Sequence, residues 1–330
     1  MKRNILIMFL LLLLVSALPF IASAYAVNLA AEIFIMAIFA MSLGLIMGYA
    51  GMVSLGHAAF FGIGSYSIAI LGPKIPNFYL LLLSSILISG IIALITGAIF
   101  IRTSKFYFLM ITLAFGQLLF ALSWQLKEWT GGADGMKVST FMNFGFGDIT
   151  GPLGIYYVMA FAFVFVYILL QFFVNSPAGK IIKGTMENES RMSALGYNIR
   201  NYKLLAYSFS GALAGFAGSL YGYYNLFVSP DLTNWMFSGQ VMIMVIIGGV
   251  GTLMGPAIGA GLFIFLQNFI STYTERWPII MGVLLVVLVL VGKGGIIHWL
   301  GLLKSRLVFR RKIPKKESPP QQVEKKEVVS

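Results

Sequence analysis

The stretch NSPAGKIIKGTMENESRMSALGYNIRNYK, residues 175–203, decides the fold class of this chain. It is polar, it separates two long apolar regions, and five of its seven charged side chains are basic. A water-facing segment in an apolar chain is a loop between membrane spans, and loops rich in Lys and Arg stay in the cytoplasm. Within it, residues 186–195 are predicted to form one short helix, preceded by Gly184 and closed by Gly196 in a left-handed cap. Such a helix indicates a docking element, and a solvated connector is the alternative.

The composition of the 330-residue chain is that of a membrane protein. Hydrophobic residues make up 59% of it and charged residues 10%, whereas soluble domains have about 25% charged residues. At roughly 20 residues per span, the chain has room for about ten transmembrane helices. The formal net charge is +12, but the basic residues lie at span ends and in the tail, which indicates membrane topology and anionic lipid and not nucleic acid.

The apolar segments predict an all-α polytopic membrane protein with both termini in the cytoplasm. The ten predicted spans are residues 4–24, 29–48, 53–71, 78–101, 106–124, 153–174, 204–224, 237–254, 255–272 and 278–297. This topology places 4 of the 23 basic residues outside and the other 19 inside, as expected for an inserted protein. The Gly-rich junctions at 48–51 and 248–255 are too short for ordinary loops and indicate broken or re-entrant helices buried in protein.

The two ends of the chain differ from the membrane domain predicted for residues 28–303. Residues 1–27 combine Lys2 and Arg3 with an apolar run and small residues, the outline of a cleavable signal peptide or of a retained first span. Retention is favoured because further spans follow at once. Residues 304–330 form a basic, Pro-containing tail that we expect to be disordered and to lie on anionic lipid.

Motifs for catalysis are absent from the sequence. It has no G-x-x-x-x-G-K-[ST] phosphate loop, no H-E-x-x-H metal motif and no cysteine. We therefore expect no enzyme activity, no metal and no cofactor in this chain. An ion-coupled carrier is a less favoured alternative, because such carriers place ionisable groups deep in the bilayer. The main group of this kind, Glu32, is expected in the first turn of its span, near the outer surface.

Several polar side chains fall within or beside the predicted spans. They are candidates for lining the path of a neutral or zwitterionic solute, and hydrogen bonding between helices is the alternative. The candidates are Ser54, His57, Thr112, Gln117 and Gln240. For His57, three residues after Ser54 at a helix start, a hydrogen-bonded packing role is favoured.

Glycines occur in pairs four residues apart, which places them on one helix face and lets helix backbones approach closely. These helix-packing candidates are Gly211, Gly215, Gly218 and Gly222 on one span, and Gly251, Gly255 and Gly259 near a later junction. A Gly-x-x-Gly pattern occurs at both 48–51 and 248–251. Both junctions are predicted on the cytoplasmic side, whereas an inverted repeat would place them on opposite sides, so they are not assigned as repeat mates.

The chain contains four motifs in this order: GYAGMVSLGHAAFFGIGSY at 48–66, ITLAFGQ at 111–117, TGGADG at 130–135 and GGVGTLMGP at 248–256. Together they resemble the motifs of the M-type permease subunits of branched-chain amino-acid ABC importers. Residues 187–203 are similar to that family's ATPase-facing loop, and the resemblance covers about residues 28–300. Gly44 departs from the family pattern, where an Asn is expected in many relatives, which leaves the solute open.

The resemblance implies a multi-pass permease subunit in the cell membrane of a prokaryote. Its expected partners are a paralogous second permease subunit, two cytoplasmic subunits that bind ATP, and an extracytoplasmic solute-binding protein received by the outer loop at 127–152. The expected ATPase-coupling loop, residues 175–203, contains Gly184, Met186, Glu187, Arg191, Ala194, Leu195 and Gly196. The expected solute is a branched-chain amino acid, and a relative that imports urea, amides or a sugar is the alternative.

Overall fold

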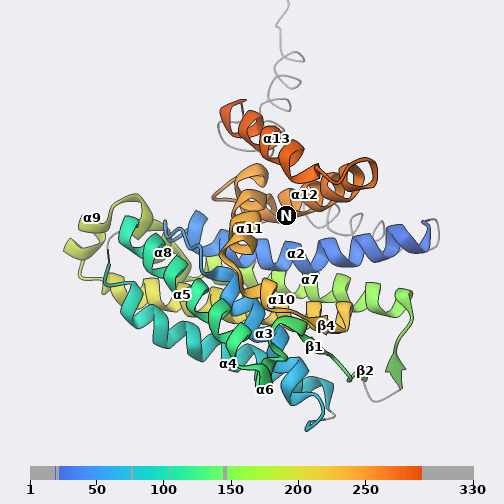
Figure 1. Cartoon of the computed structure of the whole chain (residues 1–330). Helices are drawn as coiled ribbons and strands as arrows, with labels where there is room; N and C mark the ends of the chain where they lie inside the picture. The colour runs from blue at the N-terminus through green and yellow to red at the C-terminus, as the bar shows by residue number, and fades with distance from the viewer. Residues whose placement is uncertain (1–18, 20–21, 76, 104, 144–146, 292–330) are drawn as a thin grey trace, which may run out of the picture.

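The computed structural model describes residues 19, 22–75, 77–103, 105–143 and 147–291, and these form a helical bundle with two short strand pairs (Figure 1). Most of the predicted first span, the end of the last span and the tail lie outside the described residues. The elements, in chain order, are α2 (Ala24–Gly48), α3 (His57–Leu71), α4 (Phe78–Phe100), α5 (Lys105–Gln125), α6 (Lys127–Thr130), η1 (Gly132–Asp134), β1 (Met136–Lys137), β2 (Met142–Asn143), β3 (Asp148–Ile149), α7 (Pro152–Asn175), α8 (Pro177–Glu187), α9 (Glu189–Ala194), α10 (Ile199–Asn225), β4 (Phe227–Val228), η2 (Pro230–Thr233), α11 (Trp235–Gly248), α12 (Met254–Tyr273) and α13 (Trp277–Val291).

The long helices agree with the predicted spans. Six helices among the described residues, α2, α4, α5, α7, α10 and α12, are long and apolar enough to cross a membrane. The helices α3 and α11 have 15 and 14 residues, and at 1.5 Å per residue neither reaches across a hydrocarbon core of about 30 Å. The fold is thus that of a polytopic helical membrane protein. The helix α2 begins at Ala24, so Glu32 lies in its third turn and not in the predicted first turn.

Two of the predicted spans form shorter helices than predicted, because one starts later and the other ends earlier. Residues 53–56, expected to be helical, are not, and residues 249–253 separate α11 from α12. The stretch before α3 is largely buried, and its backbone has partners: the Leu55 N–H donates to Thr112 Oγ1 at 3.3 Å and the Met52 N–H donates to the Ile46 carbonyl at 2.9 Å. Non-helical backbone is tolerated in a membrane protein when it is buried and hydrogen-bonded in this way. The junction before α3 is thus non-helical backbone buried in protein, as predicted, whereas Val250 and Gly251 of the second junction are exposed and belong to the turn between α11 and α12.

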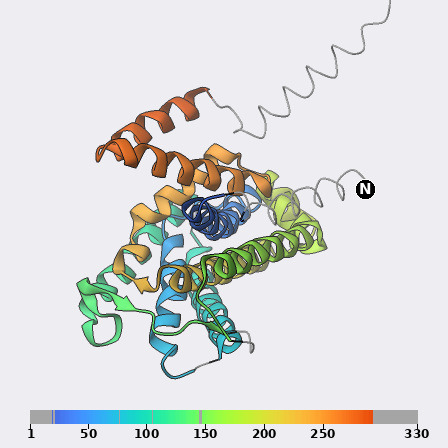
Figure 2. The same ribbon diagram turned by 90° about the vertical axis from the view of Figure 1, so that its right-hand side faces the viewer.

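The helix α2 forms the centre of the bundle, because residues 35–46 are all buried. It contacts α7, α10, α11 and α12, while α10 packs against α3 and α4. In both views α12 and α13 lie on one side of the other long helices (Figures 1 and 2). The outer faces of α4 and α7 expose large apolar side chains such as Leu87, Ile91, Phe161 and Phe172. Such faces suit contact with lipid or with a second membrane subunit.

The helix connections gather at two opposite ends of the bundle. One end, called the α8–α9 end below, holds α8, α9, the two Gly-rich junctions and the turn after α4 (Figure 1). At the other end, called the strand end, β1 pairs antiparallel with β4 and β2 with β3. The chain order places Lys74, Lys127 and Lys137 at the strand end. These are three of the four basic residues that were predicted to lie outside.

Candidate functional site

The polar segment forms two helices, α8 and α9, and the prediction of a single helix over residues 186–195 is wrong. Asn188 separates the two helices: its backbone is extended (φ −156°, ψ 101°), and its Oδ1 accepts the Arg191 N–H at 2.9 Å. Asn is a favoured N-cap residue because its side chain satisfies a free backbone N–H, and this local signal was available in the sequence. Gly184 consequently lies inside α8. Gly196, with φ +86°, follows α9 in the predicted left-handed conformation.

The apolar side chains of this segment divide into two groups. Met186 packs on Gly51, where an added Cβ would lie 3.2 Å from Met186 Cγ, and Met192 packs on Gly184. Leu195, by contrast, is 65% exposed, and Ala194, Glu187 and Arg191 are exposed as well. Leu195 and Ala194 are therefore available to a partner, whereas the two methionines have contacts within the chain, although Met186 is also 44% exposed.

The two Gly-x-x-Gly junctions touch each other beside α8. A Cβ atom placed on Gly48 would lie 2.6 Å from the backbone nitrogen of Gly251. Gly51 (φ +68°) and Gly251 (φ +91°) have left-handed backbones, which glycine adopts without strain. The sequence placed both junctions on one side of the membrane, and the structure adds that they are in contact and that Met186 of α8 lies against the first of them.

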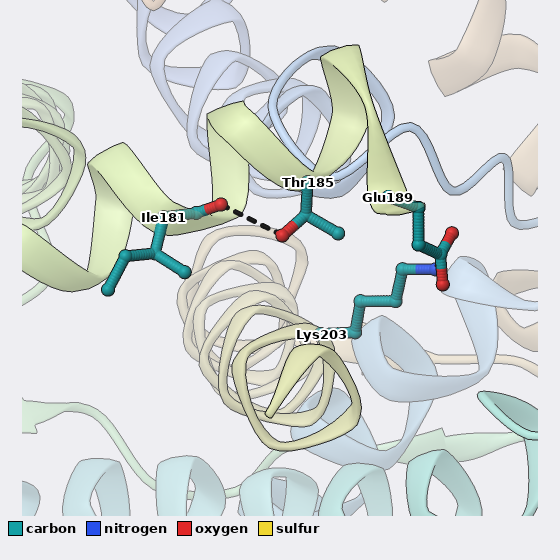
Figure 3. A network of polar contacts seen from close by, with 4 residues as sticks. All are labelled: Ile181, Thr185, Glu189 and Lys203. Carbon is teal, nitrogen blue, oxygen red and sulfur yellow. Dashed lines mark hydrogen bonds and ion pairs between the residues drawn. The ribbon is translucent and has the colours of Figure 1, made fainter. Parts of the chain in front are cut away.

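Two basic side chains at the start of α10 connect this end to neighbouring helices. The Arg200 guanidinium donates through Nη2 to the Ala98 carbonyl of α4 at 3.0 Å. Lys203 forms an ion pair with Glu189 of α9, with 2.8 Å between Nζ and Oε2 (Figure 3). A cavity of about 170 Å³ lies next to this pair. Its lining comes from α8 and α9, the junction after α2, the turn after α4, α5 and α10: Ala50, Gly51, Met52, Ile101, Thr103, Phe108, Thr185, Met186, Glu187, Glu189 and Lys203.

His57 is fully buried where α2, α3 and α10 meet. Its Nε2 lies 2.9 Å from Ser42 Oγ and 3.4 Å from Ser210 Oγ. Each hydroxyl donates its hydrogen elsewhere, Ser42 to the Phe39 carbonyl and Ser210 to the Ser42 carbonyl. Both oxygens therefore act as acceptors toward the ring, and Nε2 carries the proton. The ring also stacks on Phe39 with 5.6 Å between centroids. This arrangement is that of a hydrogen-bonded packing histidine.

The other predicted path residues occupy different surroundings. Thr112 is buried and donates from Oγ1 to the Leu109 carbonyl at 2.9 Å while it accepts the Leu55 N–H, so its hydroxyl holds the broken start of α3 in place. Ser54 is buried in the same stretch. Gln117 on α5 and Gln240 on α11 are half-buried. The structure thus groups Ser54, His57 and Thr112 around the start of α3.

The first two glycines of α10 pack against α4. Gly215 lies against Ser89, and Gly211 lies against Ala93. Ser89 Oγ donates to the Gly211 carbonyl at 2.7 Å, and Ser85 Oγ lies 3.2 Å from the Gly215 carbonyl. Hydrogen bonds thus accompany the close backbone approach that glycine permits.

The next two glycines of α10 face α3. Gly218 lies directly against the Phe61 carbonyl, while Gly222 has ordinary contact with Ser65. Ser65 Oγ donates to the Gly218 carbonyl at 2.7 Å. With the contacts to α4, these bonds make α3, α4 and α10 one packed unit.

The later glycines serve the contact between α11 and α12. Gly259 lies against the Met244 carbonyl, and Gly255 lies against the Gly249 carbonyl. Gly251, in the junction between the two helices, faces Gly48. This second group therefore lets α12 fold back closely along α11.

Comparisons with known proteins agree with this architecture. Residues 25–291 match the family described as branched-chain amino acid transport system, permease component. The chain is 27% identical over 313 residues to the high-affinity branched-chain amino acid transport system permease protein LivM of Salmonella typhimurium, which covers 88% of this chain and 73% of the relative. It is 27% identical over 308 residues to the LivM protein of Escherichia coli, covering 85% and 72%. A tyrosine transport system permease protein of Clostridioides difficile is 30% identical over 139 residues, 42% of this chain and 44% of the relative. No solved structure matches the chain.

Proposed function

The chain belongs to the family of permease components of branched-chain amino acid transport systems, and from this premise we propose that it is the membrane subunit of an ATP-driven importer of branched-chain amino acids. It forms part of the translocation path, and separate subunits bind and hydrolyse ATP. The sequence supports this division of labour, because it has no phosphate loop. The names of the LivM relatives support the solute class.

The contact between Met186 and Gly51 carries the proposal that the α8–α9 segment couples ATP hydrolysis to transport. One side of the segment is exposed through Leu195, while Met186 packs against the junction between α2 and α3. That junction in turn touches the junction between α11 and α12 through Gly48 and Gly251. A partner that moves the segment would therefore act on both Gly-rich junctions at once.

The proposed docking surface is the exposed end of α9, with Arg191 and Ala194, and Leu195 after it. None of the residues of α9 is buried, and the exposed Leu195 offers an apolar anchor of the kind that dominates docking interfaces. This end of the bundle faces the cytoplasm in our proposal, since it carries a concentration of basic residues. Those among the described helices and turns are Arg102, Lys105, Lys180, Lys183, Arg191, Arg200 and Lys203.

The opposite, strand end is proposed to receive an extracytoplasmic solute-binding protein. Its loop is held in place: Thr130 Oγ1 donates to the Ser123 carbonyl at 2.6 Å, and β1 pairs with β4, with Met136 opposite Val228. Trp129 in this loop is 62% exposed. A fixed loop with an exposed aromatic side chain suits a docking role better than a mobile connector does.

Reconstitution tests the proposed function directly. The full chain would be placed in proteoliposomes with its second permease, the two ATPase subunits and the solute-binding protein, and uptake of labelled leucine, tyrosine and urea would be compared with and without ATP. We expect ATP-dependent uptake of leucine. Uptake of leucine without ATP or ATPase subunits would contradict the proposal, and ATP-dependent uptake of urea alone would assign the chain to the alternative solute class.

A further inference from the structure

The helix α9 has few contacts that could hold it in a defined position. It has six residues, and none of them is buried. Met192 fixes it to α8, because an added Cβ at Gly184 would lie 3.0 Å from Met192 Sδ. A helix this short and this exposed is not stable by itself. Its position relative to the membrane helices therefore depends on specific contacts with its neighbours.

The polar contact between α9 and α10 is the ion pair between Glu189 and Lys203. The Lys203 side chain is 19% exposed and lies on α10, while the Glu189 side chain is 55% exposed and begins α9. This is the one ion pair within the part of the chain that the structure describes. Figure 3 shows Lys203 reaching from α10 toward Glu189 across the space between the two helices.

A cavity lies next to the ion pair, between the α8–α9 segment and the turn after α4. Met186 and Glu187 line the cavity from the segment, whereas Ile101 and Thr103 line it from the end of α4. The segment is thus not packed solidly against the end of α4 at this place. Lys203 and Glu189 both line the same cavity, so the ion pair joins α9 to α10 where close apolar packing is incomplete.

Arg200 extends the connection from α10 to α4. It lies in the first turn of α10, where the helix dipole disfavours a cation, and it donates to the Ala98 carbonyl in the last turn of α4, where the dipole favours one. The two basic residues, three positions apart, therefore connect the start of α10 to α9 on one side and to α4 on the other. The chain of contacts runs from the docking helix to a membrane helix that packs along α10.

We propose that Glu189 and Lys203 are positioning residues: their ion pair sets the orientation of α9 and transmits its displacement by an ATPase subunit to α10 and α4. This inference rests on the proposed coupling role of the α8–α9 segment. The pair should contribute little to folding, because the Glu189 carboxylate is more than half exposed and water screens its attraction to Lys203. Breaking the ion pair leaves the side chains of the docking surface around Leu195 in place, so the ATPase subunits can still bind while the connection from α9 to α10 is lost.

The test uses the complete transporter with its ATPase subunits and solute-binding protein in proteoliposomes. Glu189→Lys, Lys203→Glu and the exchanged double variant would be compared with Lys180→Glu, a matched charge reversal at an exposed position in the first turn of α8. Four quantities would be measured: thermal stability, co-purification of the ATPase subunits, ATP hydrolysis stimulated by the leucine-loaded binding protein, and uptake of labelled leucine.

We expect each single variant to keep its stability and its ATPase subunits and to lose about fivefold or more in stimulated hydrolysis and uptake, as for a typical coupling between two sites. The exchanged double variant should recover both activities, and Lys180→Glu should retain them. Parental uptake in the single variants, or no recovery in the double variant, would overturn the inference. Loss of ATPase subunits from the single variants would also overturn it and would assign the pair to the docking surface. A parental chain that recruits no ATPase would refute the proposed function together with the inference.

Discussion

Gly44 of α2 lies directly against Pro256 of α12, so closely that a Cβ atom on Gly44 would lie 2.6 Å from Pro256 Cγ. The absence of a side chain at position 44 is therefore what allows α12 to pack along the central helix. The two helices meet near the junctions that follow α2 and precede α12, next to the α8–α9 segment. The departure at Gly44 from the Asn expected in the family thus has a packing consequence in this chain.

Gly44→Asn should destabilise the protein by about 1–3 kcal/mol, because an inserted side chain forces the close contact apart. The double variant Gly44→Asn with Pro256→Ala should recover part of this loss, since alanine lacks the Cγ atom that is in the way. Thermal unfolding in detergent, monitored together with leucine uptake, measures both effects. Equal stability of Gly44→Asn and the parent would show that the helices can separate at this point without cost.

Gly218 and Gly222 form a matched pair for testing the contact between α10 and α3. Gly218→Ala should fail to assemble or lose several degrees in melting temperature, because its Cβ would overlap the rigid carbonyl of Phe61. Gly222→Ala should be tolerated, since its Cβ would lie 3.6 Å from the Ser65 carbonyl oxygen, an ordinary contact. Similar melting temperatures for the two variants would argue against this packing.

His57→Phe should be less damaging than His57→Ala. Phenylalanine keeps the stacked contact with Phe39 and gives up the hydrogen bond to Ser42, a loss of about 1 kcal/mol, whereas alanine leaves a cavity among buried rings and costs about 3 kcal/mol or more. Unfolding midpoints of the two purified variants provide the comparison. If instead both variants are stable and both abolish uptake, His57 contacts the solute and is not a packing residue.

Leu195→Asp should abolish recruitment of the ATPase subunits, because it places an unpaired charge in an apolar contact that is worth roughly 1–4 kcal/mol. Leu195 is exposed in the isolated chain, so membrane insertion and folding should be unaffected. Leu195→Met, which keeps an apolar side chain of similar volume, is the control and should recruit normally. Co-purification from solubilised membranes distinguishes the two. Normal recruitment by the Asp variant would show that the segment is only a connector.

The orientation of the two ends can be tested by cysteine labelling, since the chain contains no native cysteine. A membrane-impermeant maleimide should label a cysteine at Trp129 in intact cells and a cysteine at Leu195 only after permeabilisation. Both side chains are well exposed in the isolated chain, at 62% and 65%, so in cells that express it without its partner subunits access does not limit the reaction. Labelling of both positions from the same side would contradict the proposed topology.

Much of the helical architecture could be predicted from the sequence because its signals are local. The bounds of α4, α5, α7 and α12 agree with the predicted spans to within about a residue. The glycines of α10 were correctly predicted to pack against neighbouring helices. The break at Asn188 was also encoded locally, by an N-cap residue, and was missed because the prediction placed one helix between Gly184 and Gly196.

The sequence by itself determined the membrane class, the helix positions and the separation of basic residues between the two ends, because length, hydropathy and charge act on each segment independently of its neighbours. Only the tertiary structure decided which segments meet. The contacts between Gly48 and Gly251 and between Glu189 and Lys203 join residues from different elements. Neither pair has a local signature, since a glycine or a lysine at a helix end is compatible with many neighbours. Their partners are selected by the packing of whole helices, and that packing depends on all the side chains of the bundle together.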